Sequence, residues 1–409
     1  MTDNRTIVIV GASLAGAKAA ETLRSEGFDG RVVLIGEEPD RPYARPPLSK
    51  GYLRSDEAET KIFVHDEGFY AEHDIDLRTS TEVTAIDPAA RHVVLQGGKP
   101  VAYDRLLLTT GAVPRRLRVP GANLPGVHYL RDVNDADRLG LAIRQASRVV
   151  VVGAGWIGSE VAASARQMGA QVAMVDPAPV PLAQVLGPEV GAVFERLHAS
   201  HGVDLHPGAG VVAVVGADAA GGVRTTDGRI IEGDVVVVGI GAVPRAELAE
   251  AAGIRVGNGI EVCEYLESSI SGIFAAGDVA AAWHPGLGER IRVEHWANAL
   301  NQAQVAAKNM LGRATPYDRL PYFFSDQYEF GMEYSGFARH WDRVVFRGSP
   351  DDGKFIAFWL AGDRVLAGMN ANVWDVTGPI QALIRSGRPV DVDRLTDVGV
   401  PLEELVPEP

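Results

Sequence analysis

The stretch Thr6-Ile-Val-Ile-Val-Gly11-Ala-Ser-Leu-Ala-Gly16 decides the fold of this 409-residue chain. An apolar run typical of a buried strand ends at Gly11, and small residues then lead into a helix-forming segment, 17–24. Gly11 permits a tight turn and Gly16 lets the helix pack on the strand, which leaves backbone N–H groups at a helix N-terminus where a pyrophosphate binds. Ser13 occupies the middle position of the G-x-G-x-x-G pattern. By itself the stretch also fits a plain strand–helix turn.

A carboxylate follows at the spacing that such a phosphate-binding loop requires. The apolar run 32–35 leads into Gly36 and Glu37, and Glu37 lies 21 residues after Gly16. At this spacing a carboxylate meets a ribose hydroxyl of a bound dinucleotide. The loop and the carboxylate together predict a dinucleotide-binding unit.

The same arrangement occurs a second time in the chain. The apolar run 148–152 precedes Gly153-Ala-Gly155-Trp-Ile-Gly158-Ser-Glu160, a full G-x-G-x-x-G that opens a helix. The next strand ends in Asp176, 18 residues after Gly158. Each copy closes with Gly-Ala-Val-Pro-Arg, at 111–115 and at 241–245. Because these matches are in register, they indicate an internal duplication of one nucleotide-binding unit rather than two unrelated turns.

Charge and cysteine content restrict the class of protein. The net charge of −14 argues against nucleic acid as the main partner, since phosphate binding needs a basic face. The single cysteine, Cys263, excludes a disulfide framework and a C-x-x-C redox pair, and it indicates a reducing compartment. A strand begins within the first six residues, which leaves no room for a signal peptide, and no apolar run reaches the ~18 residues of a membrane helix. We therefore expect a protein of the bacterial cytoplasm with no membrane partner.

The rest of the chain contains further β-rich regions. Within 75–109, the alternating runs 82–86 and 92–95 predict an antiparallel hairpin or meander. A short strand ends in Gly277-Asp278, and a helix is predicted from the region of Trp296 to about residue 311. From residue 316 onward, aromatic and β-rich runs followed by a helix at 376–385 predict an α+β domain with no nucleotide loop.

Two dinucleotide units in one chain need two nucleotide ligands, and FAD with a nicotinamide is the economical pair. Four motifs resemble those of the FAD-dependent ferredoxin reductases, within the pyridine-nucleotide disulfide oxidoreductase superfamily. They are Arg45-Pro-Pro-Leu-Ser-Lys50, Gly153–Glu160, Ala276-Gly-Asp278 and Ser325-Asp-Gln-Tyr328.

The resemblance implies an α/β fold with two Rossmann-like dinucleotide-binding domains of the glutathione-reductase-like type, the second inserted in the first, and a C-terminal α+β domain. We expect the FAD-binding domain at 1–112 and 243–316. The NAD-binding domain is expected at 113–242 and the α+β interface domain at 317–409.

The resemblance also implies the residues that bind the two coenzymes. For FAD they are Gly11, Ser13, Leu14, Ala15, Gly16, Glu37, Arg45, Lys50, Val83, Thr110, Gly111, Arg131, Gly277, Asp278 and Trp296. For NAD they are Gly153, Gly155, Trp156, Ile157, Gly158, Glu160, Asp176 and Gly241. The family usually has a smaller residue where this chain has Trp296, so we expect only a main-chain contact there. Trp156 matches an aromatic residue that covers the flavin face until nicotinamide enters, but a simply packed loop tryptophan is the alternative.

Lys50 and Glu160 are the candidate catalytic residues. A cation beside the flavin N5 atom stabilises the negative charge of the reduced ring, and a lysine near a buried ring needs a carboxylate partner. The resemblance implies that Glu160 is this partner. The alternative is a surface ion pair worth under ~1 kcal/mol. No metal site is required.

Asp176 bears on the choice of nicotinamide coenzyme. A carboxylate at this strand end accepts hydrogen bonds from both ribose hydroxyls of NADH and repels a 2′-phosphate, and no arginine follows in Pro177-Ala-Pro-Val-Pro. We therefore expect NADH in preference to NADPH.

The predicted function is electron transfer from NADH through FAD to a 2Fe–2S ferredoxin, which supplies a haem monooxygenase or a ring-hydroxylating dioxygenase. We expect a monomer or weak dimer. One alternative is an NADH-dependent disulfide or peroxide reductase, which would need Cys263 beside the flavin. Another is a redox signalling flavoprotein resembling apoptosis-inducing factor.

Overall fold

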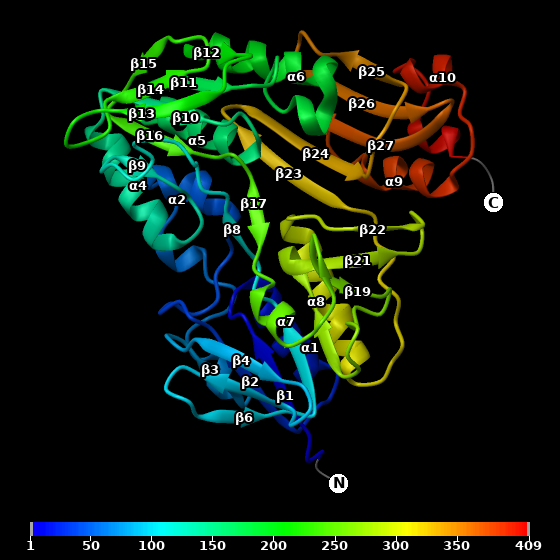
Figure 1. Cartoon of the computed structure of the whole chain (residues 1–409). Coiled ribbons are helices and arrows are strands. Elements are labelled where there is room, and N and C mark those ends of the chain that lie inside the picture. The colour runs from blue at the N-terminus through cyan, green and yellow to red at the C-terminus, as the bar shows by residue number, and fades with distance from the viewer. Residues whose placement is uncertain (1–2, 407–409) are drawn as a thin grey trace. The chain divides into compact units, whose positions relative to one another are not determined.

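The computed structural model describes residues 3–406, which form two compact units, each built from three segments of the chain (Figure 1). Unit 1 contains 3–44, Glu59–Val113 and Val243–Pro321. Unit 2 contains Arg45–Ala58, Pro114–Ala242 and 322–406.

Unit 1 is centred on a five-stranded parallel sheet. Strands of such a sheet are buried on both faces, and this explains the continuous apolar run at Thr6–Val10. Helices α1 (Leu14–Ser25) and α8 (Trp296–Met310) pack against each other in this unit. In spatial order the strands are β20 (Ile273–Ala275), β7 (Arg105–Leu108), β1 (Thr6–Val10), β2 (Arg31–Ile35) and β3 (Ile75–Arg78).

The region predicted as an antiparallel meander divides between two sheets. The predicted hairpin is confirmed, because β4 (Val83–Asp87), β5 (His92–Leu95) and β6 (Pro100–Ala102) form an antiparallel sheet. Ile75–Arg78 instead joins the parallel sheet as the edge partner of β2. Its alternating pattern indicates a strand but carries no information about the partner. The remaining elements of unit 1 are α3 (Phe69–Glu72), α7 (Glu247–Ala251), β18 (Val256–Gly257), β19 (Gly259–Val262), β21 (Ala280–His284) and β22 (Glu289–Ile291).

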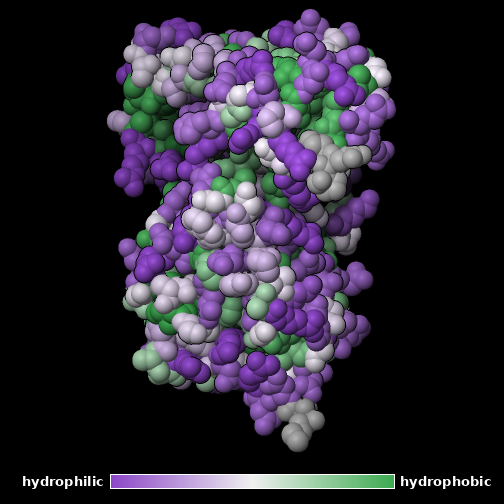
Figure 2. Space-filling model, turned by 90° about the vertical axis from the view of Figure 1, so that its right-hand side faces the viewer, coloured by the Kyte–Doolittle hydropathy of each residue, from purple (hydrophilic) through white to green (hydrophobic). Residues whose placement is uncertain are grey.

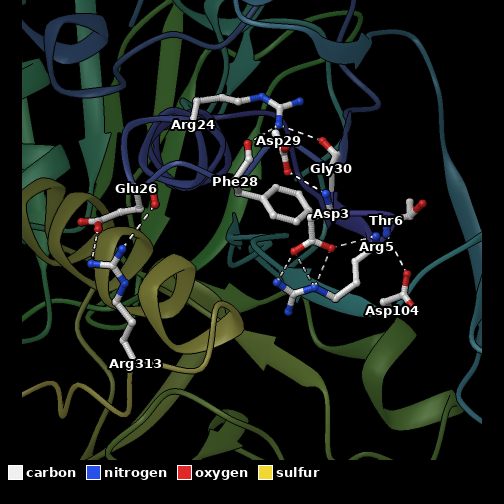
Figure 3. Close-up of polar contacts among 10 residues, drawn as sticks. All are labelled: Asp3, Arg5, Thr6, Arg24, Glu26, Phe28, Asp29, Gly30, Asp104 and Arg313. Carbon is white, nitrogen blue, oxygen red and sulfur yellow. Dashed lines mark hydrogen bonds and ion pairs between the residues drawn. The ribbon is translucent and has the colours of Figure 1, made fainter. Parts of the chain in front are cut away.

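Polar contacts hold the amino-terminal end of β1, away from its glycine loop (Figure 3). The Thr6 backbone N–H donates to Asp104 at 2.7 Å, and Arg5 forms an ion pair with Asp3. Near the end of α1, Arg24 donates to the carbonyl oxygens of Phe28 and Gly30. These contacts fix the strand and the helix on either side of the loop.

Unit 2 contains a second five-stranded parallel sheet and an adjoining antiparallel sheet. Helix α5 (Trp156–Gln167) follows β10 as α1 follows β1, and α6 (Ala183–Ser200) leads into β12. The parallel strands, in spatial order, are β12 (Val203–Pro207), β11 (Gln171–Asp176), β10 (Arg148–Val152), β16 (Val235–Val238) and β9 (Val127–His128). The other elements of this part are η1 (Pro46–Ser49), α2 (Gly51–Arg54), α4 (Val133–Gln145), β13 (Val211–Val215), β14 (Gly222–Thr225) and β15 (Ile230–Glu232).

The C-terminal part of unit 2 is a five-stranded antiparallel sheet with helices after its last strand. The predicted helix at 376–385 is α9 (Thr377–Ser386), which packs on β27 and β24. The predicted class, an α/β fold with two Rossmann-like sheets and a C-terminal α+β part, is confirmed. The strands, in spatial order, are β23 (Tyr322–Gln327), β24 (Phe330–Gly336), β27 (Arg364–Ala371), β26 (Lys354–Ala361) and β25 (Arg343–Ser349), and α10 (Val392–Thr396) follows α9.

Hydrophilic residues cover most of the face shown in Figure 2, with hydrophobic residues in smaller patches. Between residues 3 and 406, none of the helices has the length and apolar character needed to cross a bilayer. The chain passes from one unit to the other within two short strands, β8 (Ala112–Pro114) and β17 (Ala242–Pro244). Both strands contain the repeated Ala-Val-Pro.

Candidate functional site: two glycine loops and a buried lysine–glutamate pair

The first glycine loop, in unit 1, needs glycine at two positions. Gly11 has φ 114°, and a Cβ placed there would lie 2.2 Å from the Thr109 carbonyl oxygen. A Cβ at Gly16 would lie 2.1 Å from the Gly11 carbonyl oxygen. Real Cβ atoms do not approach so closely, so α1 can pack against the end of β1 only with glycine at these positions.

The second loop, in unit 2, repeats this geometry. Gly153 has φ 102°, and its Cβ would lie 2.3 Å from the Gly239 carbonyl oxygen, while a Cβ at Gly158 would lie 2.0 Å from the Gly153 oxygen. The middle glycine differs, because a Cβ at Gly155 would have no atom of the chain within 4 Å. This explains why the first loop accommodates Ser13 at the equivalent position.

Both loops present helix N-termini suited to a phosphate group. Ser13 and Gly155 are the N-cap residues of α1 and α5, and neither helix has a side-chain hydrogen bond at its cap. The first N–H groups of a helix otherwise need a partner, and a pyrophosphate supplies acceptors for them. The residues present therefore fit two dinucleotides, one in each unit.

A carboxylate follows the second strand of each parallel sheet. Glu37, just after β2, forms a bidentate ion pair with Arg245, in which Nη2 and Oε2 are 2.8 Å apart. Asp176, at the end of β11, accepts hydrogen bonds from the N–H groups of Ala154 and Ala178, both at 2.7 Å. These bonds fix the orientation of the Asp176 carboxylate beside the second loop, and each oxygen keeps a free lone pair.

Lys50 and Glu160 form a buried ion pair within unit 2. The Lys50 Nζ lies 2.7 Å from Glu160 Oε2, and the two side chains are only 14% and 6% exposed. Two adjacent prolines begin η1 and position Lys50, while Glu160 lies in the first turns of α5. The alternative of an exposed surface ion pair is therefore wrong.

Two hydroxyl groups complete the surroundings of Glu160. Ser49 Oγ donates to Oε2 at 2.5 Å, and Ser325 Oγ, from β23, donates to Oε1 at 2.7 Å. Both serines are buried. With the Lys50 ammonium, three donors converge on this carboxylate and fix its orientation.

Further charged and aromatic groups lie close to Lys50. Its Nζ is 6.0 Å from the centre of the Phe324 ring. Burial raises the pKa of Asp326, and the Lys50 ammonium opposes this shift whereas the Glu160 carboxylate adds to it. Lys50 thus belongs to a small group of charges with Glu160 and with Asp326 of β23.

Trp156 begins α5 and is partly buried. Its ring makes edge contacts with Phe194 and Phe323, with centroids 6.0 and 4.8 Å apart. Its predicted role as a cover for the flavin face stays a prediction. Ile157, next in α5, is 45% exposed, and Gly241 has φ 101° in the turn after β16.

The remaining predicted FAD residues divide between the units. In unit 2, Arg45 Nη1 donates to the Arg131 carbonyl oxygen. In unit 1, Thr110 donates to the Arg245 carbonyl oxygen at 2.6 Å, and the Gly277 N–H donates to Gln302 at 2.9 Å. Leu14 and Ala15 are buried in the first turn of α1, Val83 begins β4, Gly111 has φ 71°, Asp278 lies in the turn after β20, and Trp296 begins α8 with 39% of its surface exposed.

Sequence reasoning missed three partners of the candidate residues. Ser49 and Ser325 occur in quoted motifs without an assigned role, and Arg245 ends the repeated Gly-Ala-Val-Pro-Arg. Repetition and motif membership were the available signals, but neither identifies a partner far away in the chain.

Cys263 follows β19 in unit 1, outside both glycine loops.

Comparisons with known proteins cover nearly the whole chain. The family model described as pyridine nucleotide-disulphide oxidoreductase matches residues 5–303, and the model described as reductase C-terminal matches residues 322–406. Rhodocoxin reductase from Rhodococcus erythropolis is 43% identical over 90% of this chain and 86% of that protein.

Two other matches extend over almost the full length. The ferredoxin–NAD(+) reductase component of the anthranilate 1,2-dioxygenase system of Burkholderia cepacia is 40% identical over 98% of each chain. The crystal structure of the covalent putidaredoxin reductase–putidaredoxin complex matches with a TM-score of 0.94 and 36% identity, over 98% of each chain.

Proposed function

The chain belongs to the pyridine nucleotide-disulphide oxidoreductase family, whose members use a flavin and NAD(P)H, and on this premise we propose that it is an NADH:ferredoxin oxidoreductase carrying FAD. In this proposal electrons pass from NADH through FAD to a 2Fe–2S ferredoxin. The ferredoxin then supplies an oxygenase, either a haem monooxygenase or a ring-hydroxylating dioxygenase. Relatives that are named as ferredoxin reductase components and match over the full length support this assignment.

We propose that each glycine loop binds one coenzyme. Gly11, Ala15 and Gly16 would hold the FAD pyrophosphate at the start of α1, with Glu37 on the adenosine ribose. Gly153, Gly155 and Gly158 would hold NADH at the start of α5. The matched Cβ distances in the two loops and the helix N-termini without side-chain caps support this assignment.

Lys50 and Glu160 would serve the hydride-transfer step. When bound, FAD accepts a hydride from NADH and passes the electrons on one at a time. The Lys50 ammonium would stabilise the negative charge that develops on the ring, and the N-terminus of α8 would act in the same direction through its dipole. Glu160 orients Lys50 and compensates its charge, since an isolated ammonium with 14% exposure would lose part of its hydration.

The coenzyme preference follows from the end of β11. Asp176 lines a small pocket together with Glu195 and His206, and none of the described residues lining it is lysine or arginine. The two carboxylates in this lining disfavour a 2′-phosphate. We therefore expect kcat/KM for NADH to exceed that for NADPH by at least ten-fold. Equal values, or a preference for NADPH, would contradict the assignment of Asp176.

The presence of a single cysteine bears on which kind of molecule accepts the electrons from the flavin. A disulfide reductase needs a thiol that reacts beside the flavin, and usually a pair of them. Cys263 has no second cysteine in the 409 residues with which to form a disulfide within the chain. This leaves a protein that accepts single electrons as the acceptor that fits best.

Anaerobic reduction of candidate 2Fe–2S ferredoxins tests this function. Purified protein should be yellow, should bleach on addition of NADH, and should then reduce a ferredoxin that passes electrons to cytochrome c. Cytochrome c with NADH and no ferredoxin is the control. A flavin that NADH reduces but that reduces none of the candidate ferredoxins would refute the choice of acceptor, and a colourless protein would refute the coenzyme assignment.

A further inference from the structure

A chain of hydrogen bonds continues beyond Glu160 into the interior of unit 2. Ser325 Oγ donates to Glu160 Oε1 at 2.7 Å and accepts from Gln327 Nε2 at 3.3 Å. Gln327 Oε1 lies 3.0 Å from His198 Nε2, and His198 Nδ1 lies 3.3 Å from the Tyr328 hydroxyl. Ser325 and Gln327 lie on β23, His198 lies on α6 and Tyr328 directly follows β23, and the nucleotide-binding assignment gives none of these four residues a role.

The bonds can all run in one direction, toward Glu160. His198 with its proton on Nε2 donates to Gln327 Oε1 and accepts from the Tyr328 hydroxyl at Nδ1. The Gln327 amide then donates to Ser325, and the Ser325 hydroxyl has only the carboxylate of Glu160 as its acceptor. Every member of the chain is satisfied in this arrangement, and hydrogen bonds aligned in this way polarise and strengthen one another.

The position of these polar groups in the sheet is unusual. On β23, Ser325 and Gln327 alternate with exposed residues and point to the buried face, where both are 1% exposed. Apolar residues would normally occupy such positions, because a buried polar group is costly unless it is hydrogen-bonded. Their hydrogen bonds with Glu160 and His198 offset this cost and connect the four residues in one network.

His198, which lies between Gln327 and Tyr328, anchors this hydrogen-bond chain in α6. It is fully buried, and burial lowers its pKa to about 4, although the Gln327 hydrogen bond acts in the opposite direction. The ring is therefore neutral near pH 7, as the proton on Nε2 and the acceptor at Nδ1 require. Its place in α6 anchors the amide of Gln327 to a helix rather than to a loop.

We propose that Ser325, Gln327 and His198 are positioning residues, which hold the Glu160 carboxylate in the orientation that orients Lys50. The proposal rests on the proposed function, because Lys50 acts on hydride transfer there. It assigns a role to Ser325-Asp-Gln-Tyr328, the C-terminal motif that the coenzyme contacts leave unexplained. Without the Ser325 hydroxyl, Glu160 keeps only the donors on one of its oxygens and is free to rotate away from Lys50.

A double-mutant cycle tests this coupling. Ser325→Ala and Gln327→Met are made in the wild-type protein and in Glu160→Gln, and flavin reduction by NADH is followed by anaerobic stopped-flow absorbance. A charge-assisted hydrogen bond corresponds to roughly ten-fold in a rate or equilibrium constant, so we expect Ser325→Ala to slow reduction by about ten-fold. Gln327→Met, one bond further away, should slow it by about three-fold. In Glu160→Gln both effects should fall below about two-fold.

Ser335→Ala is the matched control. Ser335 is equally buried, on the neighbouring strand β24, and accepts a hydrogen bond from Gln381 instead. Its substitution should leave the reduction rate within about two-fold in both backgrounds. Urea midpoints of the same holoenzymes give a second reading, in which Ser325→Ala lowers the midpoint more in the wild-type protein than in Glu160→Gln.

Two results would overturn the proposal. One is an unchanged rate in Ser325→Ala; the other is a Ser325→Ala effect of equal size in both backgrounds, which would mean that the serine acts independently of Glu160. A wild-type flavin that NADH does not reduce would contradict the proposed function instead. In that case the urea cycle still measures the coupling between Ser325 and Glu160.

Discussion

Replacing Glu160 with glutamine removes the charge opposite Lys50 while nearly preserving the side-chain shape. In the native protein Oε2 faces Lys50 and Ser49, and Oε1 faces Ser325. The amide of glutamine has one acceptor oxygen, so its NH₂ group must face one of these donors. Lys50 cannot accept a hydrogen bond but a serine hydroxyl can, so we expect the NH₂ group to turn toward Ser325.

The cost of this change follows from burial. The Lys50 and Glu160 side chains are 14% and 6% exposed, so water screens neither of them as it does a surface pair. Removing one partner of a buried pair costs about 3–5 kcal/mol because the other charge is left without compensation. The remaining exposure of Lys50 and the retained shape of glutamine lower this, and we expect a loss of ~2–3 kcal/mol in the free energy of unfolding.

Urea denaturation at pH 7 measures the loss, and the chain offers a close control. Lys18 and Glu21 also lie 2.7 Å apart, but their side chains are 21% and 39% exposed. Glu21→Gln should cost under ~1 kcal/mol. Equal losses in the two variants, or a loss under ~1 kcal/mol in Glu160→Gln, would refute the reasoning from burial.

Three further predictions concern other residues. Gly158→Ala should abolish NADH binding, measured by flavin reduction, since its Cβ would lie 2.0 Å from the Gly153 oxygen, whereas Gly155→Ala, with open space around its Cβ, should leave the urea midpoint unchanged. Cys263→Ser should keep NADH-driven ferredoxin reduction within about two-fold, and a large loss would indicate thiol chemistry. Burial lowers the pKa of His198 from its ordinary 6.5 to about 4, so the unfolded chain binds the extra proton between these values, and stability falls as the pH falls through that window. Protonation of His198 accounts for a loss of up to about 3 kcal/mol in the free energy of unfolding as the pH falls. His198→Gln should therefore make the decline of the urea midpoint with falling pH shallower, and an identical decline would contradict this prediction.

The elements that the sequence predicts well are those fixed by local chemistry. The glycine loops and the strands before them follow from short-range constraints, because Gly11 and Gly153 need a positive φ and the apolar runs match strands buried on both faces. The positions of Glu37 and Asp176 at the ends of the second strands follow from their spacing to the glycine loops alone. The two sheets and the first helices therefore appear where the sequence predicts them.

The contacts that sequence reasoning missed join residues far apart in the chain. Glu37 pairs with Arg245, and Glu160 receives hydrogen bonds from Ser49 and Ser325. Each of these depends on how separate segments pack, which neither periodicity nor motif spacing encodes. The parallel pairing of Ile75–Arg78 was missed for the same reason.

The six-segment division of the chain has a practical consequence for anyone who wishes to dissect it. Lys50 and Glu160 reach unit 2 on different segments, Arg45–Ala58 and Pro114–Ala242, and the third segment carries Ser325. Neither a stop codon at any position nor a single protease cleavage can therefore release one unit whole. Recombinant fragments should fail to fold autonomously, and rearranged genes that splice the matching segments with new linkers are the rational route to isolated halves.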